Sequence, residues 1–203
     1  MKLKRLILGP LQSNGYVISN EKKECIVIDP GHIGKKIVNY IEENELTLKV
    51  VLLTHCHCDH IGAVDYLYQR MPCPIYTHQD GMEMLKNTTL NLSINFDPFI
   101  VNAPVLPSQE KMEICGFEIR WLYLPGHCEG ASMIYFVNEN IIFSGDVLFK
   151  GSIGRYDFPN SSKHDMKQSL LQIKDYDFDA IVYPGHGEAT SIKQEQQNNP
   201  FFN

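Results

Sequence analysis

One short segment limits what this chain can fold into more than any other. It reads Thr54-His55-Cys56-His57-Cys58-Asp59-His60 and directly follows a run, residues 50–53, that is apolar at every position. Such a run is typical of a central strand that is buried on both faces. Because alternate residues of an extended chain face the same side, His55, His57 and Asp59 can converge, and His60 can join them as the chain turns into a helix. Imidazole nitrogens and carboxylate oxygens are ligands for zinc, iron or manganese, so the segment predicts a metal site at a strand end.

Two other interpretations fit this segment less well. A solvated polar turn would crowd three imidazoles against a buried strand, where their protonated forms would repel one another. A structural zinc site built on Cys56 and Cys58 normally needs a second pair of similar ligands, and the sequence has no Cys-x-x-Cys. At alternate positions the two cysteines should point away from the histidines, so we expect them to be buried thiols.

Three further segments share one design, in which an apolar run ends in a glycine followed by His or Asp. They end in Pro125-Gly126-His127, Ser144-Gly145-Asp146 and Pro184-Gly185-His186. Glycine allows a sharp turn beside a metal, and the preceding strand supplies rigidity. Each segment alone is weak evidence, but four strand-end ligand sites in one chain predict a common centre. The remaining histidines lack this setting and are expected to be surface or packing residues; they are His32, His78 and His164.

The rest of the chain predicts a strand-rich α+β domain. Short apolar runs bounded by Gly and Pro predict strands at 3–8, 16–19, 25–29, 50–53, 74–77, 117–124, 132–137, 140–143 and 180–183. Helical spacing and a capping pattern predict helices at 33–44, 59–69 and 79–86, one opening at Ser162, and a last one from about residue 189. Residues 87–109 contain three prolines and predict a long loop. We expect residues 1–203 to form one domain of packed sheets with helices outside.

Charge and hydropathy limit the partners that we expect. The net charge of −6 gives no broad electrostatic footprint for nucleic acid. No stretch approaches the roughly 18 apolar residues of a membrane span, and the apolar run 6–8 is too short for a signal-peptide core. A chain of this size does not need disulfides, so its six cysteines are expected to be reduced. We therefore expect a cytoplasmic protein that acts on a small molecule, without a nucleic acid or membrane partner, and its oligomeric state stays open.

The order of the ligand segments carries a family resemblance. Thr-His-x-His-x-Asp-His over 54–60, then Pro-Gly-His over 125–127, Gly-Asp at 145–146 and Gly-His at 185–186, resembles the metallo-β-lactamase superfamily. The match spans residues 54–187. The resemblance implies a four-layer αββα sandwich, an α+β fold, with the active site at one edge of the paired sheets.

The resemblance also implies how two divalent metal ions share the ligands. One ion would be bound by His55, His57 and His127, the other by Asp59, His60 and His186, and Asp146 would bridge the two beside a water or hydroxide. Zinc is the favoured metal, with iron or manganese as alternatives, because histidine and aspartate accept all three.

Residues 145–159 are similar to the glyoxalase II-like branch, the hydroxyacylglutathione hydrolases, and within it to the short bacterial type. This resemblance implies hydrolysis of a thioester such as S-lactoylglutathione by the bridging hydroxide, which Asp59 would help to orient. Arg155 would pair with a carboxylate of the thiol carrier, and Tyr156 is a weaker candidate for substrate contact. Two departures from the family pattern, Cys128-Glu129 in place of Thr-Pro and Tyr156 in place of Thr, can reshape the pocket. The chain ends soon after His186, so the helical domain with which long glyoxalases bind glutathione is expected to be absent, which leaves the thiol carrier open.

Other functions stay open on the sequence alone. A persulfide dioxygenase of the same fold would hold a single iron on His55, His127 and Asp146. A secreted β-lactamase is disfavoured by the lack of an export signal, and a nuclease of this fold by the acidic charge and short length. A redox or metal-storage role for the cysteines is the least favoured.

Overall fold

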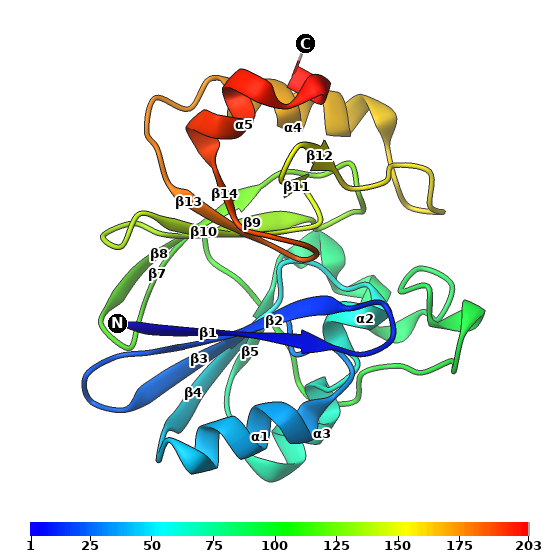
Figure 1. Cartoon of the computed structure of the whole chain (residues 1–203). Helices are drawn as coiled ribbons and strands as arrows, with labels where there is room; N and C mark the ends of the chain where they lie inside the picture. The colour runs from blue at the N-terminus through cyan, green and yellow to red at the C-terminus, as the bar shows by residue number, and fades with distance from the viewer. Residues whose placement is uncertain (203) are drawn as a thin grey trace.

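The computed structural model of this protein describes residues 1–202. Two six-stranded sheets lie face to face, and helices cover the outer face of each sheet (Figure 1). This arrangement confirms the four-layer αββα sandwich expected from the sequence. No helix in the described residues is both long and apolar enough to cross a membrane.

The first sheet has the strand order β1-β2-β3-β4-β5-β6. Its antiparallel half contains β1 (Lys2–Leu8), β2 (Ser13–Ser19) and β3 (Glu24–Ile28). Its parallel half continues with β4 (Thr47–Leu52), β5 (Ile75–Thr77) and β6 (Leu106–Pro107). The connections carry α1 (Gly34–Glu43), α2 (Cys58–Ile61) and α3 (Val64–Arg70). Because β3 and β4 are parallel, both end at the same edge of the sheet.

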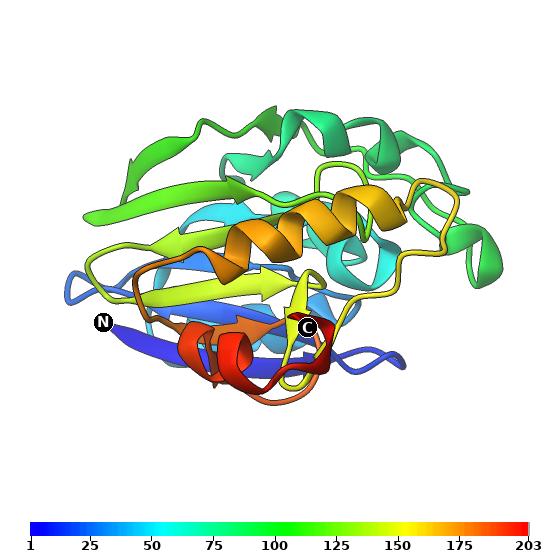
Figure 2. The same cartoon turned by 90° about the horizontal axis from the view of Figure 1, so that it is seen from above.

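The second sheet has the order β14-β13-β10-β9-β8-β7. Its strands are β7 (Lys111–Ile114), β8 (Phe117–Tyr123), β9 (Ser132–Phe136), β10 (Ile141–Gly145), β13 (Ile181–Pro184) and β14 (Thr190–Ser191). A separate hairpin pairs β11 (Leu148–Phe149) with β12 (Ser152–Ile153). Figure 2 shows α4 (Lys163–Lys174) and α5 (Ile192–Asn198) lying across this sheet, and the chain closes with η4 (Pro200–Phe202).

Period-two alternation of apolar residues builds the layer between the sheets. Ile26 and Ile28 of β3 face this layer from the first sheet, and Phe136 and Phe143 face it from the second. The two phenylalanine rings meet with centroids 5.5 Å apart at a steep interplanar angle, a favourable aromatic geometry. Val27, on the opposite face of β3, instead belongs to the apolar cluster that includes the helices.

Two expected helices differ from the prediction. The helix expected over 59–69 is divided into α2 and α3, because two distant residues compete for its hydrogen bonds. The carbonyl of Asp59 accepts from the hydroxyl of Ser13, and the amide of Ala63 donates to the carbonyl of Gly31. The segment expected as a helix over 79–86 forms two 3₁₀ turns, η1 (Gln79–Gly81) and η2 (Glu83–Lys86).

Three other regions follow the prediction more closely. The last helix begins at Ile192 rather than near residue 189, because residues 190 and 191 first pair with β13 as β14. The expected loop over 87–109 is irregular apart from η3 (Ser93–Asn95) and β6. The cap expected at Ser162 is present, since its hydroxyl accepts from the amide of Asp165 at the start of α4.

Candidate metal centre

Strand direction brings the four ligand segments to one edge of the sandwich. In the second sheet β8, β10 and β13 run in the same direction, because β9 is antiparallel to both β8 and β10 and β13 is parallel to β10. The segments after these three strands therefore emerge on one side, where the segment after β4 also lies beside α2 (Figure 1). The structure thereby gathers in one place all seven side chains that the sequence nominates as ligands: His55, His57, Asp59, His60, His127, Asp146 and His186.

The first group contains three buried imidazoles, those of His55, His57 and His127. One ring nitrogen from each lies within 4.8 Å of the others, and Nδ1 of His57 is 2.9 Å from Nε2 of His127. Nδ1 of His55 contacts the hydroxyl of Thr54. The Nε2 atoms of His55 and His57 are both buried without a hydrogen-bond partner. Buried polar atoms are seldom left unpaired, so these nitrogens suit a bound cation.

The second group contains Asp59, His60 and His186, again with ligand atoms within 4.8 Å of one another. Oδ2 of Asp59 lies 3.1 Å from Nε2 of His186 and 3.5 Å from Nε2 of His60. The Nε2 atom of His60 is buried without a hydrogen-bond partner. His60 is fully buried, whereas His186 is partly exposed at the mouth of the centre.

Asp146 lies between the two groups. Its Oδ2 is 3.6 Å from Nε2 of His127 and also 3.6 Å from Nε2 of His186. Its Oδ1 is 3.4 Å from Nε2 of His60 and forms no hydrogen bond. A single carboxylate thus faces imidazoles of both groups, which is the position that a bridging ligand requires.

Burial and neighbouring charges set the protonation of these side chains. Burial lowers the pKa of His55 and His57 well below the ordinary histidine value, and nearby imidazoles lower it further. Burial alone would raise the pKa of Asp146, but His60 and His127 hold it well below the usual range. Neutral imidazole and ionised carboxylate are the forms that bind metal, so His55, His57 and Asp146 suit a divalent ion directly. The carboxylates around His60 and His186 outweigh burial and raise the pKa of both imidazoles, so a bound ion would displace their protons.

Asp29 is part of the site although the sequence predicts it only as the last residue of the strand over 25–29. It is 2% exposed, and its Oδ1 accepts from the amide of Thr54 at 2.8 Å. Its Oδ2 accepts from the hydroxyl of Thr54 and lies 2.9 Å from Nδ1 of His60. Because these bonds occupy both oxygens, Asp29 orients His60 instead of facing an ion. Its position at the end of β3, the parallel neighbour of β4, is the signal that could have identified it.

Glycines allow the ligand segments to approach one another closely. A Cβ atom on Gly185 would collide with Oδ1 of Asp146 and lie 2.6 Å from Cε1 of His60. A Cβ atom on Gly154 would lie 2.9 Å from Nδ1 of His127, the atom that hydrogen-bonds the carbonyl of Arg155. The glycines thus have a packing role in addition to the turns for which the sequence suggested them.

The residues nominated for substrate contact lie beside the cluster. The guanidinium of Arg155 is exposed, bonds both oxygens of Asp157 at 2.9 Å, and lies 4.5 Å from the ring centroid of Phe158. The Phe158 ring in turn has its centroid 5.4 Å from that of the His57 ring, so one aromatic ring separates the Arg155 guanidinium from His57. Tyr156 is half-buried. Contact of Arg155 and Tyr156 with substrate stays a prediction.

The cysteines beside the centre have little thiolate character. Cys56, Cys58 and Cys128 are buried and free. Burial raises the pKa of Cys56 to about 12 and that of Cys58 to about 11. The Cys56 sulfur contacts the hydroxyl of Thr77 at 3.4 Å, on the neighbouring strand β5. Buried, protonated thiols match the packing role that the sequence analysis expected.

The other histidines are used for packing or lie on the surface. His32 packs edge-on against Phe99, and the His78 ring stacks on Tyr123 with centroids 4.0 Å apart. His164 is exposed on α4.

Comparison with known proteins identifies the family. The family model of the metallo-β-lactamase superfamily matches residues 8–186, and the chain belongs to this superfamily. The chain is 35% identical to the Bacillus subtilis (strain 168) protein named "Probable metallo-hydrolase YqgX", over 100% of this chain and 98% of that protein. It is 34% identical to the hydroxyacylglutathione hydrolase GloC of Haemophilus influenzae, over 100% of this chain and 99% of that protein.

Solved structures agree with this family assignment. The crystal structure of BLEG-1 B3 metallo-β-lactamase is 35% identical, with a TM-score of 0.93 over 99% of both chains. TTHA1623, solved in a di-iron-bound form, is 34% identical, with a TM-score of 0.87 over 98% of this chain and 99% of that chain. These likenesses support the predicted fold and family and leave the substrate to be argued from the site.

Proposed function

We propose that this chain is a metal-dependent hydrolase that cleaves acyl thioesters at a dinuclear centre. The observation that carries the proposal is the position of Asp146, whose Oδ2 lies 3.6 Å from imidazole nitrogens of both ligand groups. The groups would hold the ions as the sequence suggested, one on His55, His57 and His127, the other on Asp59, His60 and His186.

Two divalent ions, when bound, lower the pKa of water towards about 7 and polarise a carbonyl oxygen. The solved di-iron form of TTHA1623 supports iron as strongly as zinc for this fold. Histidine and aspartate accept both metals, and manganese as well, so the donor set alone does not choose among them.

The chain's own residues would hold and orient the reactants. Asp59 has one oxygen near His186 and His60, so its carboxylate would also orient the attacking water towards the substrate carbonyl. Asp29 would keep His60 in a single tautomer by accepting from its Nδ1, and the carbonyl of Arg155 would do the same for His127.

The acid–base groups at hand favour a thioester over an ester or amide. A thiolate leaves readily, because the pKa of a free thiol is about 8.5, so the reaction needs no strong general acid. Both carboxylates among the nominated ligands, Asp59 and Asp146, have pKa values held below the ordinary range, which makes them poor proton donors. The similarity to GloC, a hydroxyacylglutathione hydrolase, supports S-lactoylglutathione as a first substrate to test.

We further propose that the thiol carrier passes over Phe158 and that Arg155 and Tyr156 contact it. Arg155 can bind an anionic group of the carrier only by exchanging its present partner, Asp157. A reducing compartment such as the cytoplasm, with a small molecule rather than nucleic acid or membrane as partner, is consistent with six free cysteines and the acidic net charge.

The competing function is a persulfide dioxygenase with a single iron on His55, His127 and Asp146. A dioxygenase of this fold can carry the second group unused, so the discriminating feature is the Gly-Ser-Ile-Gly-Arg run over residues 151–155, which is similar to the hydrolases and favours the hydrolase.

Two assays on one metal-loaded preparation separate these functions. We expect thiol release from S-lactoylglutathione, no oxygen uptake with glutathione persulfide, and loss of thiol release in His57→Ala. The exposed His164→Ala variant is the matched control and should keep full activity. Oxygen uptake without thioester turnover would establish the dioxygenase instead.

A further inference from the structure

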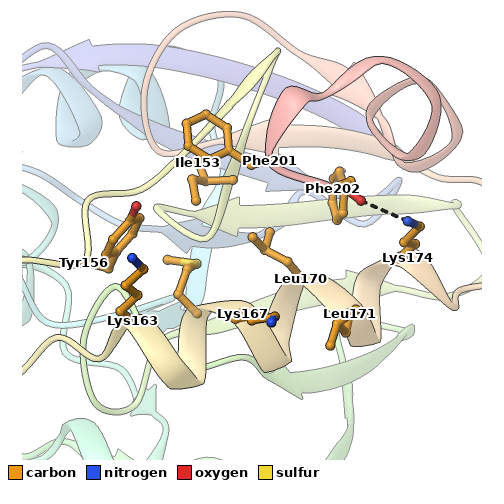
Figure 3. Close-up of a pocket in the computed structure, with 10 residues that line it drawn as sticks. Ile153, Tyr156, Lys163, Lys167, Leu170, Leu171, Lys174, Phe201 and Phe202 are labelled. Atoms are coloured by element: carbon orange, nitrogen blue, oxygen red, sulfur yellow. Dashed lines mark hydrogen bonds between the residues drawn. The ribbon is translucent and has the colours of Figure 1, made fainter.

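A cavity of about 480 Å³ lies along α4, between this helix and the chain end. Its lining combines two kinds of side chain. Figure 3 shows Lys163 and Leu170 extending from α4 toward the side occupied by Tyr156 and Phe202. Buried Met166 and Leu170 provide an apolar floor. A surface hollow with this mixture suits a ligand that is apolar along its length and charged at one end.

The charged part of the lining consists of three lysines of α4, which are Lys163, Lys167 and Lys174. Within residues 1–202, none of their ammonium groups lies within 4.0 Å of a carboxylate; Lys174 donates to the carbonyl of Phe202. Residues 163, 167 and 174 are spaced so that they lie along one face of α4. Their ammonium groups attract an anion, and as compact point charges they suit phosphate.

This cavity borders a second hollow that reaches Arg155. A neighbouring hollow of about 350 Å³ shares Ile153, Tyr156 and Phe201 with it and also includes Arg155. Arg155 covers Phe158, whose ring contacts His57. A ligand with its reacting end at the centre can therefore run over this surface towards α4.

We propose that the cavity along α4 binds the carrier arm of the substrate thioester, and that this arm has an apolar or amide stem ending in a phosphate. The proposal rests on the thioester hydrolase proposed above and names its substrate class. Arg155 is already paired with Asp157, so the cations left to receive the phosphate are those of α4. Lys163 and Lys167 are one helical turn apart and can share one dianion.

Hydrolysis of a matched pair of substrates tests this assignment. S-acetyl-4′-phosphopantetheine and S-acetylpantetheine differ only in the terminal phosphate. We expect kcat/KM to be about tenfold or more higher for the phosphorylated substrate, and the double variant Lys163→Gln/Lys167→Gln to remove this preference while leaving S-acetylpantetheine hydrolysis unchanged. Both lysines are exposed, so the substitutions should not disturb folding. Lys35→Gln/Lys111→Gln removes the same charge elsewhere and should keep the preference.

Binding of 4′-phosphopantetheine to the metal-loaded protein, measured by calorimetry, separates failure of this inference from failure of the proposed function. Binding that weakens about tenfold in the α4 double variant, but not in the control, supports the carrier site. If the same protein hydrolyses no thioester, the hydrolase proposal alone is wrong. Equal affinities in the wild type and both double variants, or no binding, would overturn the carrier site. A preference for S-lactoylglutathione that is insensitive to the α4 lysines would likewise overturn it in favour of a carboxylate-bearing carrier.

Discussion

Oδ2 of Asp29 lies 2.9 Å from Nδ1 of His60, although the two residues are on different connections of the first sheet. The same carboxylate accepts from the amide and the hydroxyl of Thr54, the residue directly before the first nominated histidine, His55. One buried side chain thus fixes both the start of the ligand segment and the tautomer of its last imidazole. Asp29 therefore sets the orientation of His60 within the second ligand group.

Asp29→Asn should weaken metal binding without removing a ligand. The amide cannot accept from all three donors in the same way, so His60 loses its fixed tautomer, and we expect metal affinity to fall about 10- to 100-fold. Titration of metal-free protein with zinc in the presence of a competing chelator measures this change. Asp177→Asn, at an exposed position, is the control. Unchanged zinc affinity in Asp29→Asn would show that this contact is not needed to orient His60.

Asp146→Ala and His186→Ala should differ in the number of metals lost. Asp146 faces both groups, so its removal is expected to weaken the binding of both ions. His186 belongs to the second group alone, so its removal should affect only one ion. Metal analysis after gel filtration should therefore find about one ion retained in His186→Ala and less than one in Asp146→Ala. If both variants keep the same metal content, Asp146 is not shared between the groups.

Gly185→Ala should disturb the centre through a single methyl group. The added Cβ would collide with Oδ1 of Asp146, so the carboxylate must move away from its present position. We expect zinc affinity to fall by at least about tenfold while the circular dichroism spectrum stays unchanged. Gly81→Ala is the matched control, because a Cβ there meets its neighbours only at 3.5 Å or more. Equal zinc affinity in the two variants would contradict the close approach.

Phe143→Ala should test the apolar layer that positions both sheets. The ring is fully buried against Tyr16 and Phe136, so its removal leaves a cavity and is expected to lower the free energy of unfolding by about 3–5 kcal/mol. Urea unfolding of the metal-free proteins measures this change without a contribution from bound ions. Phe96→Ala, at a ring that is 60% exposed, should cost far less.

The sequence could nominate these side chains because each of the four segments follows a predicted strand and three of them place a glycine directly before the His or Asp, and both signals are local. Metal binding by these side chains stays a prediction. It did not predict the role of Asp29, because Asp-Pro-Gly has the composition of an ordinary turn and only the pairing of β3 with β4 brings this carboxylate to His60. The division between α2 and α3 was missed for a similar reason, since the competing groups of Ser13 and Gly31 are distant in sequence.

Very short strands, and the cavity formed where distant segments pack together, could not be predicted from the sequence either. The strands β11, β12 and β14 have two residues each, which is too short for an alternating pattern to appear. The cavity along α4 depends on the packing of η4 against that helix. Only the capping pattern at Ser162 and the inward positions of Met166, Leu170 and Ile173 could be predicted there.

The central claim is that one carboxylate joins two metal positions, and anomalous diffraction from a zinc-loaded crystal tests it most directly. We predict two anomalous peaks, one among His55, His57 and His127 and one among Asp59, His60 and His186, with Asp146 between them. A single peak on His55, His127 and Asp146, with the second group facing only solvent, would contradict the account.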